Sequence, residues 1–265
     1  MFHHDTVLGR TGFRVGRLGI GSGYHAPAAA IEEAFERGCN YFTWGTVIKG
    51  FSPGMREALR NIAGKGARDR LVLAMFSYAH WNFLTERFLM KGLRAARTDY
   101  ADVLVLGYFP RPPSERLLEG ALKLREKGLV RAIGVSGHDR KMFAALAGDE
   151  RIGVLHLRYN AVHRGAETDI FPFLPDDPRP GTVAFTATAW GKLLRAKGMP
   201  PGEAPPTAAE CYRFALSHPA VDVCMTGPRT LEEMRQNLAV LDRGPMTGEE
   251  LDRMRRIGDR LYGRR

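Results

Sequence analysis

Cysteine is scarce in this chain, and the spacings missing around it exclude several kinds of site. Only three of the 265 residues are cysteines, namely Cys39, Cys211 and Cys224. An odd and sparse set does not build a disulfide framework, and there is no Cys-x-x-Cys pair to hold a structural zinc ion. The His-x-His and His-Glu-x-x-His spacings of other metal sites are missing too. We therefore expect no metal, and a reducing environment such as the cytoplasm.

Long apolar runs are also lacking. No uninterrupted stretch is long enough to span a bilayer, and the first residues, MFHHDTVLGRTG, contain no apolar region of the signal-peptide type. A dinucleotide-binding glycine loop is missing as well, because Gly19-Ile-Gly-Ser-Gly does not have the Gly-x-Gly-x-x-Gly spacing. We therefore expect neither a membrane protein nor a Rossmann-type cofactor site.

Positive charge, in contrast, is in excess. The chain has 39 lysines and arginines against 29 acidic residues, which gives a net charge of +10. Such an excess occurs in proteins that bind nucleic acid, anionic membranes or phosphorylated ligands. Here the arginines are spread along the chain, and no nucleic-acid-binding motif accompanies them. We therefore expect a solvated basic surface without a nucleic-acid partner.

Short β-rich runs alternate with longer amphipathic segments along the whole sequence. Eight runs have the apolar character of buried parallel strands: residues 15–20, 39–43, 71–76, 103–106, 130–135, 154–159, 182–185 and 221–225. The segment 164–180 contains four prolines and is predicted to be irregular. Eight strand–helix units in a chain of this length fit a closed barrel better than a doubly wound sheet. We therefore predict an α/β fold, a single (β/α)8 TIM barrel domain over residues 1–265.

Helix ends have signals of their own. Gly38 and Gly128 each follow an amphipathic segment, at the place where glycine most often ends a helix. The motif Thr230-Leu-Glu-Glu233 has the spacing of a capping box. We expect the Thr230 and Glu233 side chains to bond each other's backbone N–H groups.

Function in such a barrel collects at the carboxyl ends of the strands. Gly227-Pro-Arg229 lies between the eighth strand and a helix, where backbone N–H groups, the helix dipole and Arg229 would face an anion. His80 lies near Tyr78 after the third strand, and an imidazole titrates near neutrality. Both features also occur in ordinary turns and loops, so neither identifies a function alone.

Several motifs, taken in order, resemble the aldo/keto reductase family. They are Leu8-Gly-Arg-Thr-Gly-Phe-Arg-Val-Gly-Arg-Leu-Gly-Ile-Gly, Gly38-Cys-Asn-Tyr-Phe, Asp102-Val-Leu-Val-Leu, Gly128-Leu-Val-Arg-Ala-Ile-Gly-Val-Ser, Arg158-Tyr-Asn and the stretch from Gly227 to Asn237. Together they cover nearly the whole chain in the family's order. The resemblance implies a (β/α)8 barrel that uses NADPH or NADH to reduce a carbonyl or oxidise an alcohol of a small-molecule substrate.

The family's catalytic set of Asp, Tyr, Lys and His is not found at the matching positions. Thr43 stands at the aspartate position, and no tyrosine occurs between Thr43 and Ser77. Phe76 stands at the lysine position and Gly107 at the histidine position. In the family the tyrosine donates a proton to the carbonyl, helped by the lysine. The resemblance therefore implies that this proton relay is lost or rebuilt.

The family's cofactor positions are better preserved. Ser136 matches the serine that holds the nicotinamide carboxamide, His156 stands at the glutamine position, and Phe185 matches the aromatic residue that stacks on the nicotinamide. Asn237 matches the residue that faces the adenine. The implied cofactor-binding set, with neighbouring loop residues, is Ser136, His156, Phe185, Thr186, Gly227, Arg229, Glu233 and Asn237.

The choice between NADPH and NADH stays open at the sequence level. Glu233 lies where many NADPH-preferring relatives carry a basic residue, and a carboxylate there would repel a 2′-phosphate. Arg229 nearby would offset that repulsion.

Two functions follow from this pattern. In the first, an oxidoreductase has rebuilt its acid–base site, because hydride transfer is the cofactor's chemistry while the protein must handle a proton. Tyr78 is the first candidate donor, beside the lost lysine position, followed by His80, Tyr108 and Lys49. The alternative is a non-catalytic protein that binds a nicotinamide nucleotide as a sensor or partner subunit. The sequence leaves the substrate and the oligomeric state open.

Overall fold

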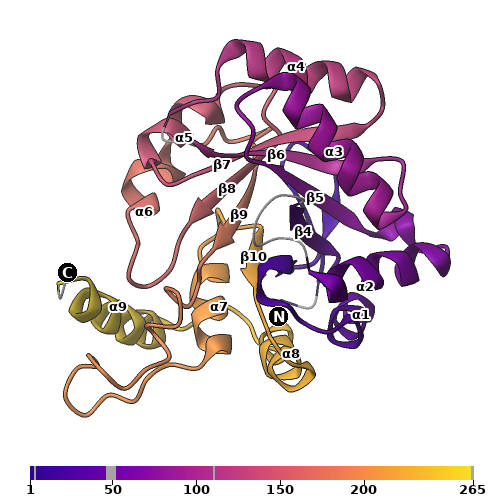
Figure 1. Ribbon diagram of the computed structural model, residues 1–265. Helices are drawn as coiled ribbons and strands as arrows, with labels where there is room; N and C mark the ends of the chain where they lie inside the picture. The colour runs from indigo at the N-terminus through magenta and orange to yellow at the C-terminus, as the bar shows by residue number, and fades with distance from the viewer. Residues whose placement is uncertain (3, 46–51, 110, 264–265) are drawn as a thin grey trace.

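The strands from β3 to β10 form a closed barrel (Figure 1). The structure is a computed structural model that describes residues 1–263 apart from residues 3, 46–51 and 110. Neighbouring barrel strands are parallel, and β10 closes the barrel on β3. The strands are β3 (Leu18–Gly21), β4 (Tyr41–Gly45), β5 (Val72–Ser77), β6 (Ala101–Phe109), β7 (Val130–Gly137), β8 (Val154–Arg158), β9 (Gly181–Phe185) and β10 (Val223–Thr226). The predicted TIM barrel is confirmed.

Helices follow the strands and form the outer layer of the barrel (Figure 1). They are α1 (Ala28–Glu36), α2 (Pro53–Gly64), α3 (Asn82–Ala96), α4 (Glu115–Glu126), α5 (Arg140–Ala147), α6 (Ala166–Asp169), α7 (Ala208–Leu216), α8 (Leu231–Leu238) and α9 (Gly248–Tyr262), with 3₁₀ turns at Ser22–Tyr24, Arg68–Arg70, Phe171–Phe173 and Ala239–Asp242. Gly38 and Gly128 have φ of +88° and +72°, as expected for glycines that end helices. Among the described residues, no helix has the length and apolar character needed to cross a membrane.

The first strand differs from the expected run over residues 15–20. Two short strands, β1 (Thr6–Val7) and β2 (Arg14–Val15), form an antiparallel hairpin, and the barrel strand β3 begins only at Leu18. Gly16 lies at the break, where a Cβ atom would overlap the carbonyl oxygen of Gly38. Leu8 and Val15 of the hairpin region are fully buried in the interior cluster of the barrel. The hairpin therefore closes the amino-terminal end of the barrel and leaves the other end as the mouth.

Two apolar clusters lie on the two faces of the barrel wall. One fills the space between strands and helices, and the other, which includes Tyr41, Val105 and Val183, fills the interior. Because side chains alternate along a strand, every second residue of each strand points inward. Inward positions near the carboxyl ends include Gly21, Thr43, Phe76, Gly107, Ser136, His156, Phe185 and Met225. These residues line the mouth.

Two buried carboxylates stabilise the opposite, amino-terminal end. Asp222 accepts hydrogen bonds from the Arg179 guanidinium at 2.5 and 2.9 Å and from the Thr182 N–H at 2.8 Å. Asp102 accepts the Leu73 N–H at 2.9 Å and pairs with two further arginines. Buried charges need such complete pairing, so these contacts are structural.

Candidate active site

Three of the positions that the sequence resemblance matches to the family's catalytic groups lie on neighbouring strands of the mouth. Thr43, Phe76 and Gly107 point inward from β4, β5 and β6. A Cβ atom on Gly107 would lie 2.9 Å from the Cβ of Ser136, which is closer than real Cβ contacts allow. The mouth is thus packed around a glycine at this position, and a histidine would not fit without movement of β7.

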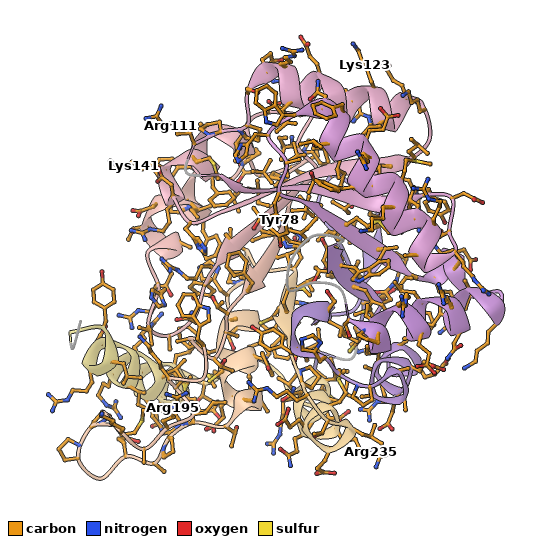
Figure 2. All side chains as sticks on the ribbon, viewed as in Figure 1. Tyr78, Arg111, Lys123, Lys141, Arg195 and Arg235 are labelled. Atoms are coloured by element: carbon orange, nitrogen blue, oxygen red, sulfur yellow. The ribbon has the colours of Figure 1, made fainter. Side chains whose placement is uncertain are left out.

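Tyr78 lies just beyond β5, at the centre of the view in which the strands converge (Figure 2). Its ring is half-buried and stacks on Phe76, with centroids 5.9 Å apart and an angle of 28° between the planes. The neighbouring His80 is exposed, as is Trp81 after it. Of the two predicted catalytic residues, the structure therefore places Tyr78 against the inner wall and His80 on the surface of the same loop. Lys49 and the side chain of Tyr108 lie outside the described residues.

Ser136 and His156 lie side by side, because they are register partners on the parallel strands β7 and β8. The Ser136 hydroxyl is buried and has no hydrogen-bond partner among the described residues. His156 is 1% exposed, and its Nε2 lies 2.6 Å from the hydroxyl of Tyr41. Burial lowers the pKa of His156 to about 3, so the imidazole is neutral at physiological pH. A buried hydroxyl without a partner is costly, which points to a polar ligand at this place.

The loop after β9 holds a strained backbone at the mouth. Thr186, Ala189 and Trp190 all have positive φ, between +50° and +57°, in the left-handed region that residues other than glycine seldom adopt. The buried amide of Asn160 donates to the carbonyl of Thr186 at 2.8 Å and helps to hold this loop. Strain of this kind concentrates at functional sites. Phe185 lies directly before the loop and is half-buried.

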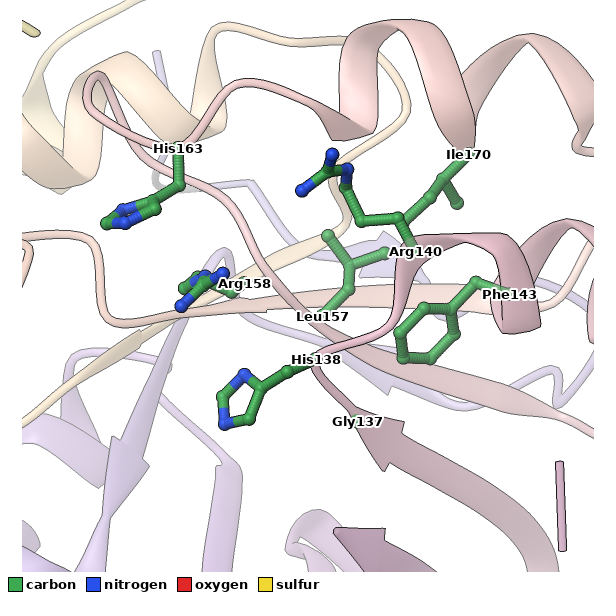
Figure 3. A pocket seen from close by; sticks show the side chains of 8 residues that line it. All are labelled: Gly137, His138, Arg140, Phe143, Leu157, Arg158, His163 and Ile170. Atoms are coloured by element: carbon green, nitrogen blue, oxygen red, sulfur yellow. The ribbon is translucent and has the colours of Figure 1, made fainter. Parts of the chain in front are cut away.

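Basic and aromatic side chains line the rim beside this loop. The guanidinium of Arg158 lies 5.7 Å from the ring centroid of Trp190, and His138 meets Phe185 edge-to-face at 5.7 Å. In Figure 3, Arg158 lies between the imidazoles of His138 and His163. Burial, followed by the charge of Arg158, lowers the pKa of His138. The enclosed space there is only about 10 Å³, room for about one water molecule.

Tyr24, from the 3₁₀ turn after β3, covers Gly227 at the end of β10. A Cβ atom on Gly227 would overlap the Tyr24 ring, so this contact requires a glycine. Tyr24 itself is 45% exposed. No sequence motif singles out Tyr24, and only its place after the first barrel strand indicates a position in the mouth.

The start of α8 differs from the predicted capping box. The Thr230 hydroxyl accepts the Glu233 N–H at 3.1 Å, as expected. The Glu233 carboxylate, however, accepts the N–H of Arg229 at 2.7 Å rather than that of Thr230. Complete capping boxes occur instead at Thr207–Glu210 and Thr247–Glu250. One N–H at the predicted anion site of Gly227–Arg229 is therefore occupied by a carboxylate of the chain itself.

Asn237 is buried on α8, and its amide donates to the Thr226 hydroxyl at 2.9 Å. This bond ties α8 to the end of β10.

The predicted cofactor positions thus gather on one side of the mouth. They lie on the consecutive elements β7, β8, β9 and β10–α8. Tyr78 comes from β5, and the Phe76 ring links the two sides, because it meets His156 edge-to-face at 5.3 Å and stacks on Tyr78.

Comparisons with known proteins agree with the barrel fold. The chain is similar to an aldo/keto reductase from Klebsiella pneumoniae, solved in complex with NADP and acetate, with a TM-score of 0.76 and 26% identity over 98% of this chain and 95% of that one. It also resembles the apo form of an aldo-keto reductase from Bacillus halodurans, with a TM-score of 0.77 and 20% identity over 96% and 95% of the two chains. No curated protein matches the chain. The model of the aldo/keto reductase family matches residues 23–210, and the chain therefore belongs to that family.

Proposed function

We propose that the protein is an NAD(P)-dependent oxidoreductase with a rebuilt acid–base site, acting on a carbonyl or alcohol of a small molecule. One observation carries this proposal. The buried hydroxyl of Ser136 has no hydrogen-bond partner among the described residues, and it lies beside His156 at the mouth of the barrel. Such an orphaned group is explained when a ligand amide supplies the missing partner.

The residues present fit a nicotinamide cofactor. Ser136 and His156 would hold the carboxamide, and Phe185 offers a half-buried ring for stacking. Gly227 and the helix that follows it would face the rest of the nucleotide. When bound, the cofactor supplies or accepts a hydride. The Klebsiella relative, whose structure contains NADP, supports this assignment.

We assign to Tyr78 the role of proton donor and acceptor. Its stacking on Phe76 holds the ring beside the position where the family has its lysine. A phenol at that place can donate a proton to a carbonyl oxygen or accept one from an alcohol. His80, exposed on the same loop, is the second candidate and would act through a rearranged loop or through water.

The packing around Gly107 favours a second function. Because Ser136 leaves no room for a side chain at Gly107, and an apolar ring stands at Phe76, the mouth has no inward ionisable group at these two positions. A protein that binds a nicotinamide nucleotide without turnover, as a sensor or partner subunit, would tolerate this arrangement.

Both functions require that the protein binds a nicotinamide nucleotide. Titration with NADH and NADPH, monitored by nicotinamide fluorescence, tests this binding. We expect saturable binding of at least one nucleotide in the micromolar range. Turnover on a broad panel of carbonyls and alcohols then supports the enzyme, whereas saturable binding with no turnover supports the second function. No binding at millimolar concentration contradicts both.

We further propose a cytoplasmic protein, because its three cysteines are all free and buried. In this proposal the basic surface faces solvent and binds no macromolecule. The partner of the protein is a small-molecule substrate.

Glu233 is expected to favour NADH over NADPH. Its carboxylate is held at the start of α8 by the Arg229 N–H, where it adds negative charge near the position of a 2′-phosphate. Glu233→Gln removes that charge and keeps the hydrogen-bonding shape. We expect the ratio of the NADPH to the NADH dissociation constant to fall about tenfold or less, as for one exposed charge.

The matched control is Glu232→Gln, on the same turn of α8 and also exposed. Binding measurements at two salt concentrations check the electrostatic origin, because screening must shrink the effect. If the ratio of the NADPH to the NADH dissociation constant were unchanged in Glu233→Gln, the 2′-phosphate would have to bind at a different part of the surface.

A further inference from the structure

A hydrogen bond crosses the interior of the barrel beneath the mouth. The hydroxyl of Tyr41, on β4, lies 2.6 Å from Nε2 of His156, on β8. Three strands separate β4 from β8 on either side, so the two side chains meet from opposite walls. Tyr41 is fully buried and His156 almost so. The bond is therefore isolated from solvent, where such an interaction fixes side-chain orientation strongly.

The direction of this bond follows from the surroundings of the two groups. Burial raises the pKa of Tyr41 well above its ordinary value, so the phenol keeps its proton. His156 is neutral and carries one ring proton. If Nε2 held that proton, the phenolic O–H would need another acceptor, and none is present among the described residues near Tyr41, which packs with Val105 and Val183. The phenol therefore donates to Nε2.

The consequence concerns the other ring nitrogen. With Nε2 as acceptor, the single proton of His156 resides on Nδ1. Among the described residues, the hydrogen bond that the His156 ring makes is the one at Nε2. The hydroxyl of Ser136, the register partner of His156 on β7, has none there. The residue with this fixed donor and the residue with this accepting hydroxyl are thus neighbours on adjacent strands. This pair complements an amide, which offers one carbonyl oxygen and one NH₂ group.

We propose that Tyr41 is a positioning residue that fixes His156 in the Nδ1–H tautomer, so that the imidazole donates to the carboxamide oxygen of the nicotinamide while Ser136 accepts from its NH₂ group. The proposal rests on the proposed function. It assigns to Tyr41 a role that is exerted only through His156, because Tyr41 itself lies too deep to touch the ligand.

The tautomer can be measured on the unaltered protein. Nitrogen-15 NMR of the full chain with labelled histidine distinguishes a protonated Nδ1 from a protonated Nε2, and comparison with His156→Gln assigns the signals. We expect His156 to have a protonated Nδ1 and an unprotonated Nε2, and Tyr41→Phe to shift it toward the other tautomer. A protonated Nε2 in the unaltered protein overturns the proposal, whatever the variants do.

Binding separates positioning from mere packing. Tyr41→Phe is expected to raise the Kd for NADH about tenfold, the effect of losing one hydrogen bond in a buried network. The Kd for an analogue that carries hydrogen in place of the carboxamide should not change. In a His156→Gln background, Tyr41→Phe should also have no effect on the Kd for NADH, since a glutamine has no tautomer to fix.

The matched control is Tyr159→Phe, which removes another buried phenol, bonded to Glu167 at 2.7 Å on the helix side of the wall. It should leave the Kd for NADH unchanged. Tyr41→Phe could instead weaken the binding of NADH and of the analogue equally, or weaken NADH binding just as much in the His156→Gln background. Either result would show that Tyr41 only supports packing. Normal NADH binding by Tyr41→Phe would overturn this inference alone, whereas binding of neither NADH nor NADPH by the unaltered protein would overturn the proposed function with it.

Discussion

Replacing Tyr78 with phenylalanine is expected to lower kcat by about 10²–10⁴-fold, the usual contribution of a positioned acid or base. The ring stacks on Phe76 through its face, so the variant keeps this packing and loses only the hydroxyl. Cofactor affinity should stay unchanged, because Ser136 and His156 lie on the other side of Phe76. A selective loss of turnover would assign the proton to Tyr78.

The comparison uses substrate turnover and NADH titration on the same preparations. Tyr100→Phe is the matched control, since Tyr100 precedes β6 at the amino-terminal end and packs against Arg68 there. His80→Gln tests the second candidate in parallel. Full activity in Tyr78→Phe would contradict the assignment of Tyr78 as the proton donor. If His80→Gln lost activity in the same experiment, His80 would be the donor instead.

The largest effect on stability is expected at Asp222. Asp222→Ala should lower the free energy of unfolding by about 3–5 kcal/mol, because it leaves a largely buried Arg179 guanidinium without its partner. The Thr182 N–H loses its acceptor at the same time. Urea unfolding followed by circular dichroism measures the change.

An exposed ion pair serves as the control for the buried pair of Asp222 and Arg179. Glu33 pairs with Arg235 at 2.8 Å between α1 and α8, but both side chains are substantially exposed. Glu33→Ala should therefore have little or no measurable effect on the free energy of unfolding, because solvent screens an exposed pair. Similar losses in the two variants would mean that burial does not determine the strength of these pairs in this barrel.

The barrel strands are predictable from the sequence because each is a short apolar run between turn residues, and glycines such as Gly38 mark the helix ends. The hairpin β1–β2 is not, since its strands have two residues each, too few to show an alternation. The capping motif at Thr230 predicts the partners correctly but not which N–H the Glu233 carboxylate takes. That choice depends on a backbone path that the spacing does not determine.

The candidate site is predictable in its positions but not in its contacts. The motifs place Ser136 and His156 at strand ends, yet nothing in the sequence joins His156 to Tyr41, which lies 115 residues earlier. The only available signal is that Tyr41 precedes Thr43 by two residues and so shares its inward face. Closure of the barrel turns this into a contact by bringing opposite walls together.

The mouth of the barrel has a consistent physical pattern. At the positions to which the sequence resemblance assigns the family's ionisable groups, this chain has Thr43, Phe76 and Gly107, and the glycine makes room for Ser136. Polar groups are concentrated instead on β7 and β8, with Tyr41 reaching across to them. The central claim is therefore that Ser136 and His156 form a binding site for a nicotinamide amide.

The most direct test of that claim compares two buried hydroxyls that have no hydrogen-bond partner within the described ranges of the chain. Ser136 lies at the mouth, whereas Thr182 lies near the amino-terminal end of β9. Titration with NADH should show a Kd about tenfold higher for Ser136→Ala than for the unaltered protein, and no change for Thr182→Val. Equal NADH binding by the unaltered protein and Ser136→Ala would contradict the account, because the orphaned hydroxyl would then have no ligand to serve.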